Sequence, residues 1–182
     1  MIEYFAALDA RFLQTLYAVR DPSSVQALIW ISELGRAWTI YGFAFCIALV
    51  LVLYRKYAYA AGLVISVATS GVGILLLKGL TQRARPPVEF QAYLEVWYSL
   101  PSAHAALSVA LYGFLAFLAW HRIKNRALRS LVITLLSLLV VLISFSRLYL
   151  GVHWASDVAM GVVLGILCAW LGAWYAQFVH KS

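Results

Sequence analysis

The sequence predicts an all-α fold, a polytopic bundle of membrane helices with five firm transmembrane spans and room for a sixth. Hydrophobic residues make up 64% of the chain and charged residues 12%, whereas soluble domains carry roughly 25% charged residues. Apolar runs long enough to cross a bilayer recur along the chain, and charges and prolines gather between them. The length of 182 residues fits one domain.

The first 34 residues are more polar than the rest. Apolar residues recur there at spacings of three and four, as in an amphipathic helix: Phe5, Leu8, Phe12, Leu16 and Val19. Because Glu3, Asp9 and Arg11 interrupt any span, we expect this helix to lie in the membrane interface and not to be a cleavable signal peptide. A turn at 21–24 predicts a second short helix, with Ser23 or Ser24 as its N-cap and its end near Gly35.

Five uncharged or nearly uncharged runs follow, and each is long enough to cross a bilayer core of ~30 Å. They cover residues 37–54, 57–77, 102–120, 130–146 and 153–178. Residues 81–100 form a long polar loop, which is a candidate for shaping a substrate site. Gly161-x3-Gly165 and Gly71-x-Gly73 predict close helix packing.

The charges between the spans predict an orientation. The connections at 55–56 and 121–129 are basic and fall on one side if the spans alternate, which favours the cytoplasm for that side and for the C-terminus. Lys78, loop 81–100 and the 146–153 connection then share the outer face. Five spans place the N-terminus outside, unless residues 1–34 supply an extra crossing.

Composition also argues against a nucleic-acid site and against a disulfide or metal site formed by the two cysteines. The chain has no basic patch on a soluble face, so we expect no nucleic acid partner. Cys46 and Cys168 both lie inside apolar runs and are interpreted as small core residues.

The segment 146–157 carries charges where a membrane protein should have none. Ionisable residues in such positions are costly and are functional candidates by default. His153 and Asp157 are four residues apart, so on a helix they would share a face. Asp157 could then accept a hydrogen bond from one ring nitrogen and leave the other nitrogen as a nucleophile or base. Arg147 lies just upstream, where it could hold an anion.

Two further clusters lie on the same predicted face. Lys78 and Arg85 offer a point charge and a planar fork suited to phosphate oxygens. Interfacial snorkelling explains these two equally well, and for Arg83 we prefer it. Pro101-Ser102-Ala103-His104 precedes an apolar run and marks a helix N-terminus, where free backbone N–H groups bind anions. His104 could there protonate a leaving oxygen.

Other polar and aromatic residues near these clusters have two interpretations each. Glu33 is either a carboxylate at the rim of the site or, as we prefer, an ordinary interfacial residue. Tyr93, Trp97 and Tyr98 either line the path of a lipid or, as we prefer, belong to an aromatic belt.

Together the three clusters describe a phosphate site: cations for the equatorial oxygens, an in-line nucleophile and an acid on the leaving side. Carboxylates and histidines do not recur at metal-ligand spacing, so we expect no metal and no cofactor.

The three clusters resemble the three-part signature of the type 2 phosphatidic acid phosphatase superfamily, which includes bacterial membrane lipid phosphatases. The matching segments are Lys78-x6-Arg85-Pro86, Pro101-Ser102-Ala103-His104 and Ser146-Arg147-x5-His153-x3-Asp157. Ala103 departs from the glycine that the family usually has. Alanine keeps the backbone N–H and suits a first helical turn, so we expect activity to survive.

The resemblance implies a role for each matched residue. His153 would attack phosphorus and become a phosphohistidine, Asp157 would orient it, and His104 would protonate the leaving group. The phosphate would be held by the remaining matched residues: Lys78, Arg85, Ser102, Ala103 through its amide, and Arg147. The single domain 1–182 would then divide into interfacial helices at 1–34 and a catalytic helical bundle at 36–182.

The resemblance also implies a substrate, a location and an alternative reaction. The substrate would be a phosphorylated lipid reached from the bilayer of a bacterial inner membrane, at its outer face. Undecaprenyl pyrophosphate ranks first, and phosphatidate, phosphatidylglycerol phosphate and a lipid A phosphate remain open, as does the oligomeric state. A lipid phosphotransferase of the same family is one alternative. A non-catalytic anion- or lipid-binding membrane protein is another, and it would not need His153 paired with Asp157.

Overall fold

Seven α-helices and one short 3-10 helix make up the regular structure of the part of the chain that is described. The computed structural model describes residues 2–181, and side chains from 6 to 179, so the predicted roles of Glu3 and Phe5 lie outside the described side chains. The helices are α1 (Ile2–Ala18), α2 (Pro22–Glu33), α3 (Ala37–Leu53), α4 (Tyr57–Thr81), α5 (Ala103–Arg122), α6 (Arg126–Tyr149) and α7 (Ala155–Lys181), with η1 (Val88–Phe90) between α4 and α5. The all-α membrane fold is confirmed.

Each predicted span forms a helix, but the number able to cross a membrane differs slightly from five. By length and composition α4, α5, α6 and α7 each qualify. Helix α3 has only 17 residues and qualifies together with α2, from which it is bent by 40°. The described residues thus hold four such helices, or five if α2 and α3 form one broken span.

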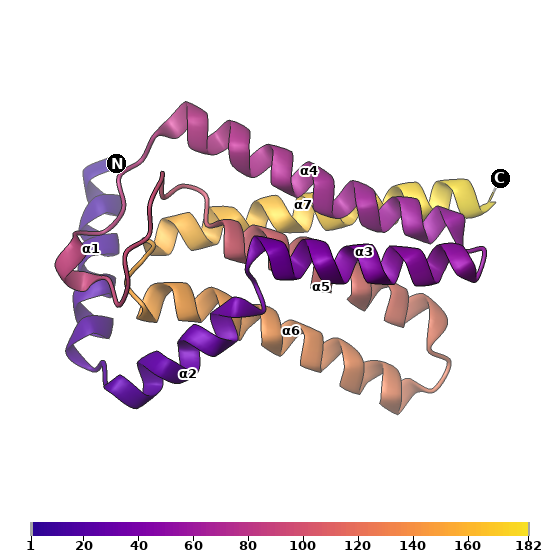
Figure 1. Cartoon of the computed structure of the whole chain (residues 1–182), viewed down its shortest axis with the longest axis horizontal. Coiled ribbons are helices and arrows are strands. Elements are labelled where there is room, and N and C mark those ends of the chain that lie inside the picture. Colours follow the sequence, from indigo (N-terminus) through magenta and orange to yellow (C-terminus); the bar gives the residue numbers. More distant parts are fainter. Residues whose placement is uncertain (1, 182) are drawn as a thin grey trace.

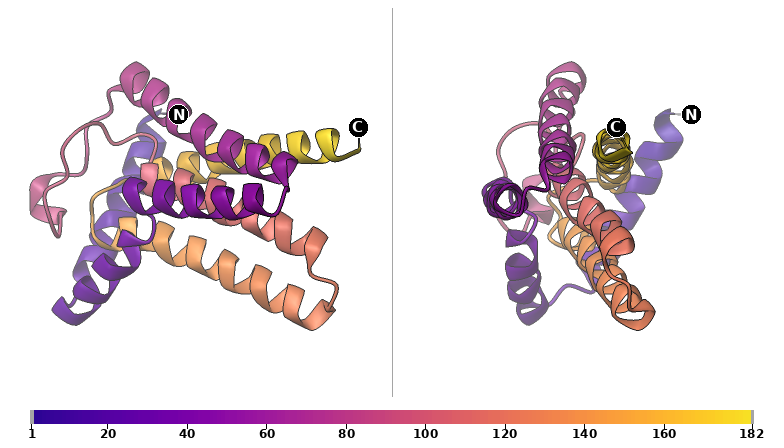
Figure 2. Two further views of the ribbon diagram at one scale, coloured as in Figure 1. Left: turned by 45° about the vertical axis from the view of Figure 1, so that its right-hand side comes forward. Right: turned by 90° about the vertical axis from the view of Figure 1, so that its right-hand side faces the viewer.

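Helices α3 to α7 run side by side along the molecule, and α1 lies across one end (Figure 1). Figure 2 shows the same bundle from two other directions, with α1 and α2 beside that end. Helix α5 is the most buried and packs against α4, α6 and α7. Large apolar side chains on the outer helix surfaces are exposed, as lipid contact requires, including Val72 and Leu76 of α4 and Leu135 of α6.

The predicted glycine contacts between helices are confirmed. A Cβ on Gly161 would lie 2.6 Å from the Ser102 carbonyl oxygen, and one on Gly165 would lie 2.6 Å from the Ala106 carbonyl oxygen. These glycines therefore allow α7 to approach the first turn of α5. A Cβ on Gly71 would lie 2.5 Å from the Tyr41 hydroxyl of α3, and one on Gly73 would lie 3.0 Å from the Leu164 side chain of α7.

The N-cap of α2 is Asp21 and not the serine that the sequence favoured. The Asp21 carboxylate accepts a hydrogen bond of 3.0 Å from the Ser24 amide. Pro22 occupies the first turn, where its missing N–H costs nothing, so the helix begins two or three residues earlier than predicted.

The two ends of the bundle differ in charge. The loop between α4 and α5, the α6–α7 connection and helices α1 and α2 lie at one end, and the other connections and the C-terminus lie at the opposite end (Figure 1). All acidic residues belong to the first end, together with half of the basic ones. The opposite end is purely basic, with Arg55, Lys56, Arg122, Lys124, Arg126, Arg129 and Lys181.

Candidate active site

A cavity of about 250 Å³ lies at the end of the bundle where the acidic residues gather, between α3, α4, α5 and the loop before α5. Five of the eight predicted site residues line it: Lys78, Arg85, Ala103, His104 and His153. Its other walls include Tyr41, Ile74 and Leu75, which come from α3 and α4. One side of the cavity is therefore polar and cationic, and the other is apolar.

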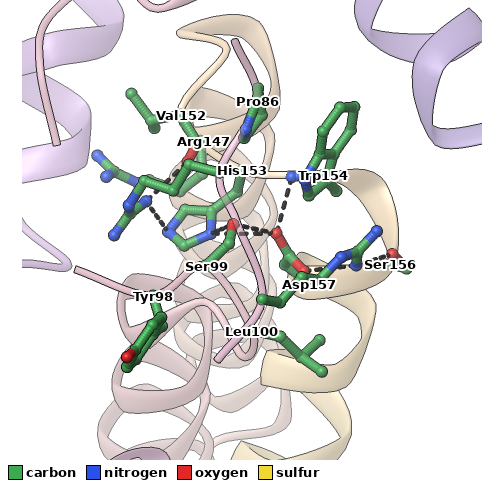
Figure 3. A network of polar contacts seen from close by, with 12 residues as sticks. Pro86, Tyr98, Ser99, Leu100, Arg147, Val152, His153, Trp154, Ser156 and Asp157 are labelled. Carbon is green, nitrogen blue, oxygen red and sulfur yellow. Dashed lines mark hydrogen bonds and ion pairs between the residues drawn. The ribbon is translucent and has the colours of Figure 1, made fainter. Parts of the chain in front are cut away.

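The imidazole of His153 is buried, and its two ring nitrogens have different partners. Nε2 lies 3.2 Å from Nη1 of Arg85. Nδ1 lies 3.3 Å from the Ser99 hydroxyl and 3.5 Å from the Asp157 carboxylate. Ser99 in turn donates a hydrogen bond to Asp157, as Figure 3 shows. The ring is thus anchored through Nδ1, while Nε2 faces the arginine.

The reason that sequence spacing gave for this pairing was wrong. Helix α7 begins at Ala155, so His153 does not lie on a helical face with Asp157. Asp157 instead sits in the first turn and accepts a 3.0 Å hydrogen bond from the Trp154 amide, as a capping residue does. The carboxylate therefore reaches back over the connection that carries His153.

Burial lowers the pKa of His153 well below its ordinary value, and the nearby positive charges of Arg147, Arg85 and Lys78 lower it further. The ring is consequently neutral at neutral pH. A neutral imidazole that holds its proton on Nδ1 keeps on Nε2 the lone pair that a nucleophile needs.

Arg83 is part of this site, contrary to the snorkelling that we preferred. Its guanidinium lies 2.7 Å from Oδ1 of Asp157 and 2.7 Å from the carboxylate of Asp9 on α1. Asp9 also accepts a 3.0 Å hydrogen bond from the Ser156 amide at the start of α7. The first helix therefore contributes a buried carboxylate next to the site, so the predicted division at residue 34 does not separate the N-terminus from it.

Arg147 is completely buried at the end of α6. It donates hydrogen bonds to the Tyr93 hydroxyl and, at 2.7 Å, to the Ser32 hydroxyl, and it forms a 2.5 Å ion pair with Glu95. Glu95 also lies 3.4 Å from Arg85. The Nε atom of Arg147 is buried and has no hydrogen-bond partner among the described residues.

Ser102 is the N-cap of α5, and its backbone amide donates a 3.0 Å hydrogen bond to the Asp157 carbonyl. Its buried hydroxyl has no partner in the part of the chain that is described. Ala103 and His104 follow in the first turn, where backbone N–H groups have no partner within the helix. The hydroxyl and these amides form a donor set suited to an anion.

Lys78 is buried near the end of α4 and does not snorkel. Its ammonium donates a hydrogen bond to the Tyr98 carbonyl and lies 5.9 Å from the centre of the Trp97 ring. Trp97 lines the cavity and Tyr93 binds Arg147, so these two aromatic residues contact the site and do not serve only as a belt. Glu33 forms an exposed 3.0 Å pair with Arg36 beside a neighbouring cavity.

Among the described side chains, no group of three or more His, Cys, Asp or Glu could hold a metal ion. Ser146, which follows the long apolar run of α6, donates to the Ile143 carbonyl within its own helix. The described residues thus bring to the site cations, two histidines, the Asp157 carboxylate and a helix N-terminus.

Residues 59–181, which are most of the chain, match the sequence pattern of the PAP2 superfamily. Phosphatidylglycerophosphatase B of Bacillus subtilis (strain 168) is 27% identical over 164 residues, which cover 90% of this chain and 80% of that protein. A protein of Escherichia coli (strain K12) that is provisionally named an undecaprenyl-diphosphatase is 40% identical over 85 residues, covering 46% of this chain and 36% of that protein.

Two crystal structures share the fold. The structure described as the first transmembrane PAP2-type phosphatidylglycerolphosphate phosphatase, from Bacillus subtilis, is similar with a TM-score of 0.85 and 25% identity, covering 97% of this chain and 86% of that one. LpxE from Aquifex aeolicus has a TM-score of 0.70 and 20% identity, covering 91% of this chain and 94% of its own.

Proposed function

This chain belongs to the PAP2 superfamily and is a lipid phosphatase, and from that premise we propose that it removes a terminal phosphate from a membrane lipid through a phosphohistidine on His153. The observation that carries the proposal is the position of His153, whose Nε2 lies beside Arg85 in a cavity shared with Lys78 and His104. The three-part motif supports it independently.

In the first step, Nε2 of His153 forms a bond to phosphorus as the bond between phosphorus and the lipid oxygen breaks. His104 donates a proton to that leaving oxygen. Lys78, Arg85 and Arg147, with the Ser102 hydroxyl and the Ala103 amide, hold the three other phosphate oxygens. The unpartnered Nε of Arg147 and hydroxyl of Ser102 support this assignment, since buried polar atoms normally have partners.

In the second step, water attacks the phosphohistidine and His104 takes up a proton from that water. Inorganic phosphate leaves, and His153 returns to its neutral form. Asp157 and Ser99 hold Nδ1, and they stabilise the positive charge that the ring gains when it is phosphorylated.

The apolar wall of the cavity indicates where the lipid lies. Tyr41 of α3 and Leu75 of α4 continue from the polar end toward the outer helix surfaces. A lipid could reach the cavity sideways with its tails in the bilayer. Phosphatidylglycerol phosphate and undecaprenyl pyrophosphate are the first candidates, because two relatives are named as phosphatases of these lipids. Both lipids present a terminal phosphate.

We also propose that the site faces the outside of a bacterial inner membrane. Both ends of the bundle carry equal numbers of basic residues, so their number alone does not orient the chain. At the site end Arg83, Arg85 and Arg147 are paired with carboxylates. At the opposite end six basic residues lie in or beside two short connections, where the positive-inside preference is counted, so that end favours the cytoplasm: Arg55, Lys56, Arg122, Lys124, Arg126 and Arg129.

A panel of purified lipid phosphates and pyrophosphates tests the function. We expect phosphate release from at least one of them, undiminished in excess EDTA and abolished in His153→Ala protein that keeps its thermal transition. Wild-type turnover in that variant would refute the catalytic assignment, and a requirement for added Mg²⁺ would refute the mechanism.

A further inference from the structure

Glu95 occupies an unusual position, because its carboxylate bridges two cations that the proposed function assigns to the phosphate. One oxygen lies 2.5 Å from Nη2 of Arg147, and the other lies 3.4 Å from Nη2 of Arg85. The residue belongs to the loop between α4 and α5, and its side chain is 24% exposed. An internal anion is thus bound where an incoming phosphate needs donors.

The Nη1 atoms of the same two arginines have other hydrogen-bond partners. The Nη1 atom of Arg147 is engaged by Ser32 and Tyr93, and that of Arg85 is engaged by the Val152 carbonyl. The terminal Nη2 groups that hold Glu95 are therefore donors that a bound anion gains in full only by replacing the carboxylate.

The space around Glu95 allows that replacement. Glu95 lines the cavity that holds His153 and also a second cavity of about 560 Å³, which Arg36 lines from the other side. Its neighbours Leu94 and Val96 are 72% and 84% exposed, so packing does not fix this part of the loop. The carboxylate can move into this second cavity toward Arg36, although Arg36 already pairs with Glu33.

The charge of the incoming group decides whether the replacement is favourable. A carboxylate carries one negative charge, and so does a phosphodiester, which is the head-group linkage of ordinary membrane phospholipids. A terminal phosphate carries about −1.5 to −2 at neutral pH. Attraction to the two arginines rises with that charge.

We propose that Glu95 is an internal competitor, an anion that pairs with Arg85 and Arg147 in the empty site and that an incoming terminal phosphate displaces. The two arginines would thereby stay paired until a ligand with more negative charge than the carboxylate arrives. This inference rests on the proposed function, since it takes the two arginines as ligands of the phosphate.

The test compares Glu95→Gln with Glu89→Gln, a matched control in the same loop whose side chain is exposed. A short-chain phosphatidylglycerol serves as the phosphodiester inhibitor, and a short-chain lipid phosphate serves as the substrate. In Glu95→Gln the cost of displacement is removed, so we expect the KM of the lipid phosphate to fall by about tenfold, the scale of one charge-assisted hydrogen bond. The inhibition constant of the phosphodiester should fall by the same factor or less, and Glu89→Gln should match the wild type.

An unchanged KM in Glu95→Gln, or weaker binding of both compounds, would overturn the inference. Thermal melting provides a second measurement in Glu95→Gln and Glu95→Ala proteins. Inorganic phosphate should raise the melting temperature of both variants more than that of the wild type, and an equal or smaller rise would also contradict the inference. Failure of the wild type to release phosphate from any lipid would instead refute the proposed function.

Discussion

The carboxylate of Asp157 is held on both of its oxygens, and the two sides differ in charge. Oδ2 accepts hydrogen bonds from Ser99 and the Trp154 amide and lies toward His153. Oδ1 forms an ion pair with Arg83, and Arg83 forms a second ion pair with Asp9. Arg83 therefore fixes the orientation of the residue that orients His153, and we regard it as a positioning residue.

Replacing Arg83 tests that role. In Arg83→Ala, the buried carboxylates of Asp9 and Asp157 lose their shared cation, so we expect a loss of about 2 kcal/mol of stability. We expect kcat to fall while KM changes little, because Arg83 does not line the cavity. Steady-state kinetics and thermal melting measure the two effects.

Two comparisons complete the test. Arg83→Lys keeps a cation and should recover part of kcat. Arg11→Ala removes an exposed charge of the same helix as Asp9 and should have no effect. A KM effect alone in Arg83→Ala would show that Arg83 binds substrate directly.

The protonation state of His153 gives a second prediction at this scale. Because burial lowers its pKa, the ring should stay neutral down to pH values below the ordinary histidine pKa of about 6.5. Below the lowered pKa the ring is protonated and cannot attack. Ring-nitrogen NMR of labelled protein, with the His153 signal identified by its loss in His153→Ala, should give a midpoint below that ordinary value. A midpoint at or above it would contradict the neutral nucleophile.

At the scale of helices, the contact between α7 and the start of α5 determines the geometry of the site. The close approach at Gly161 lets the Ser102 amide bond to the Asp157 carbonyl. This contact brings the anion-binding turn of α5 next to the connection that carries His153. The spacing of the two helices is thus coupled directly to the distance between the nucleophile and its anion donors.

Gly161→Ala should disturb both stability and turnover. The added Cβ would lie 2.6 Å from the Ser102 carbonyl, and such overpacking costs about 1–3 kcal/mol. Gly42→Ala is the control, since a Cβ there meets no described atom within 4 Å and should stabilise α3 by about 0.5–1 kcal/mol. Equal melting temperatures for the two variants would contradict the contact.

Local sequence patterns predicted the helices well and their ends less well. Uncharged runs identified helices α3 to α7, because an apolar run has few alternatives to a buried or lipid-facing helix. The start of α7 was placed at His153 and not at Ala155, since hydrophobicity does not change there. The cap of α2 was missed because Asp21, Ser23 and Ser24 are all good capping residues, and only Pro22 distinguishes them.

At the scale of the whole molecule, the distribution of basic residues predicts which end of the bundle faces the cytoplasm. With Cys46 and Cys168 first replaced by Ala, Glu89→Cys places a thiol at the site end and Lys124→Cys places one at the basic end. In intact spheroplasts, a membrane-impermeant maleimide should label the first variant, and should label the second only after permeabilisation. The reverse pattern would place the site in the cytoplasm.

The site could be predicted only where its residues belong to short motifs. Lys78, Arg85 and His153 were assigned to one face from spacing and alternation of the spans, and they do line one cavity. Glu95 and Ser99 were missed, because a loop without periodicity gives no sign of where its side chains point.

Asp9 gave a signal that was not used. It lies three residues before Phe12 on the apolar stripe of α1, where a carboxylate is rarely buried without a partner. Its partner, Arg83, is 74 residues away, a separation that no local pattern spans.

The central claim is that His153 receives the phosphoryl group, and trapping that intermediate tests it most directly. The protein is mixed with a lipid that carries a radiolabelled terminal phosphate, quenched in alkali and mapped by peptide analysis. The account predicts a label on His153 that is stable to base, labile to acid and absent from His153→Ala. Continued turnover with no label on His153 at any time would contradict it.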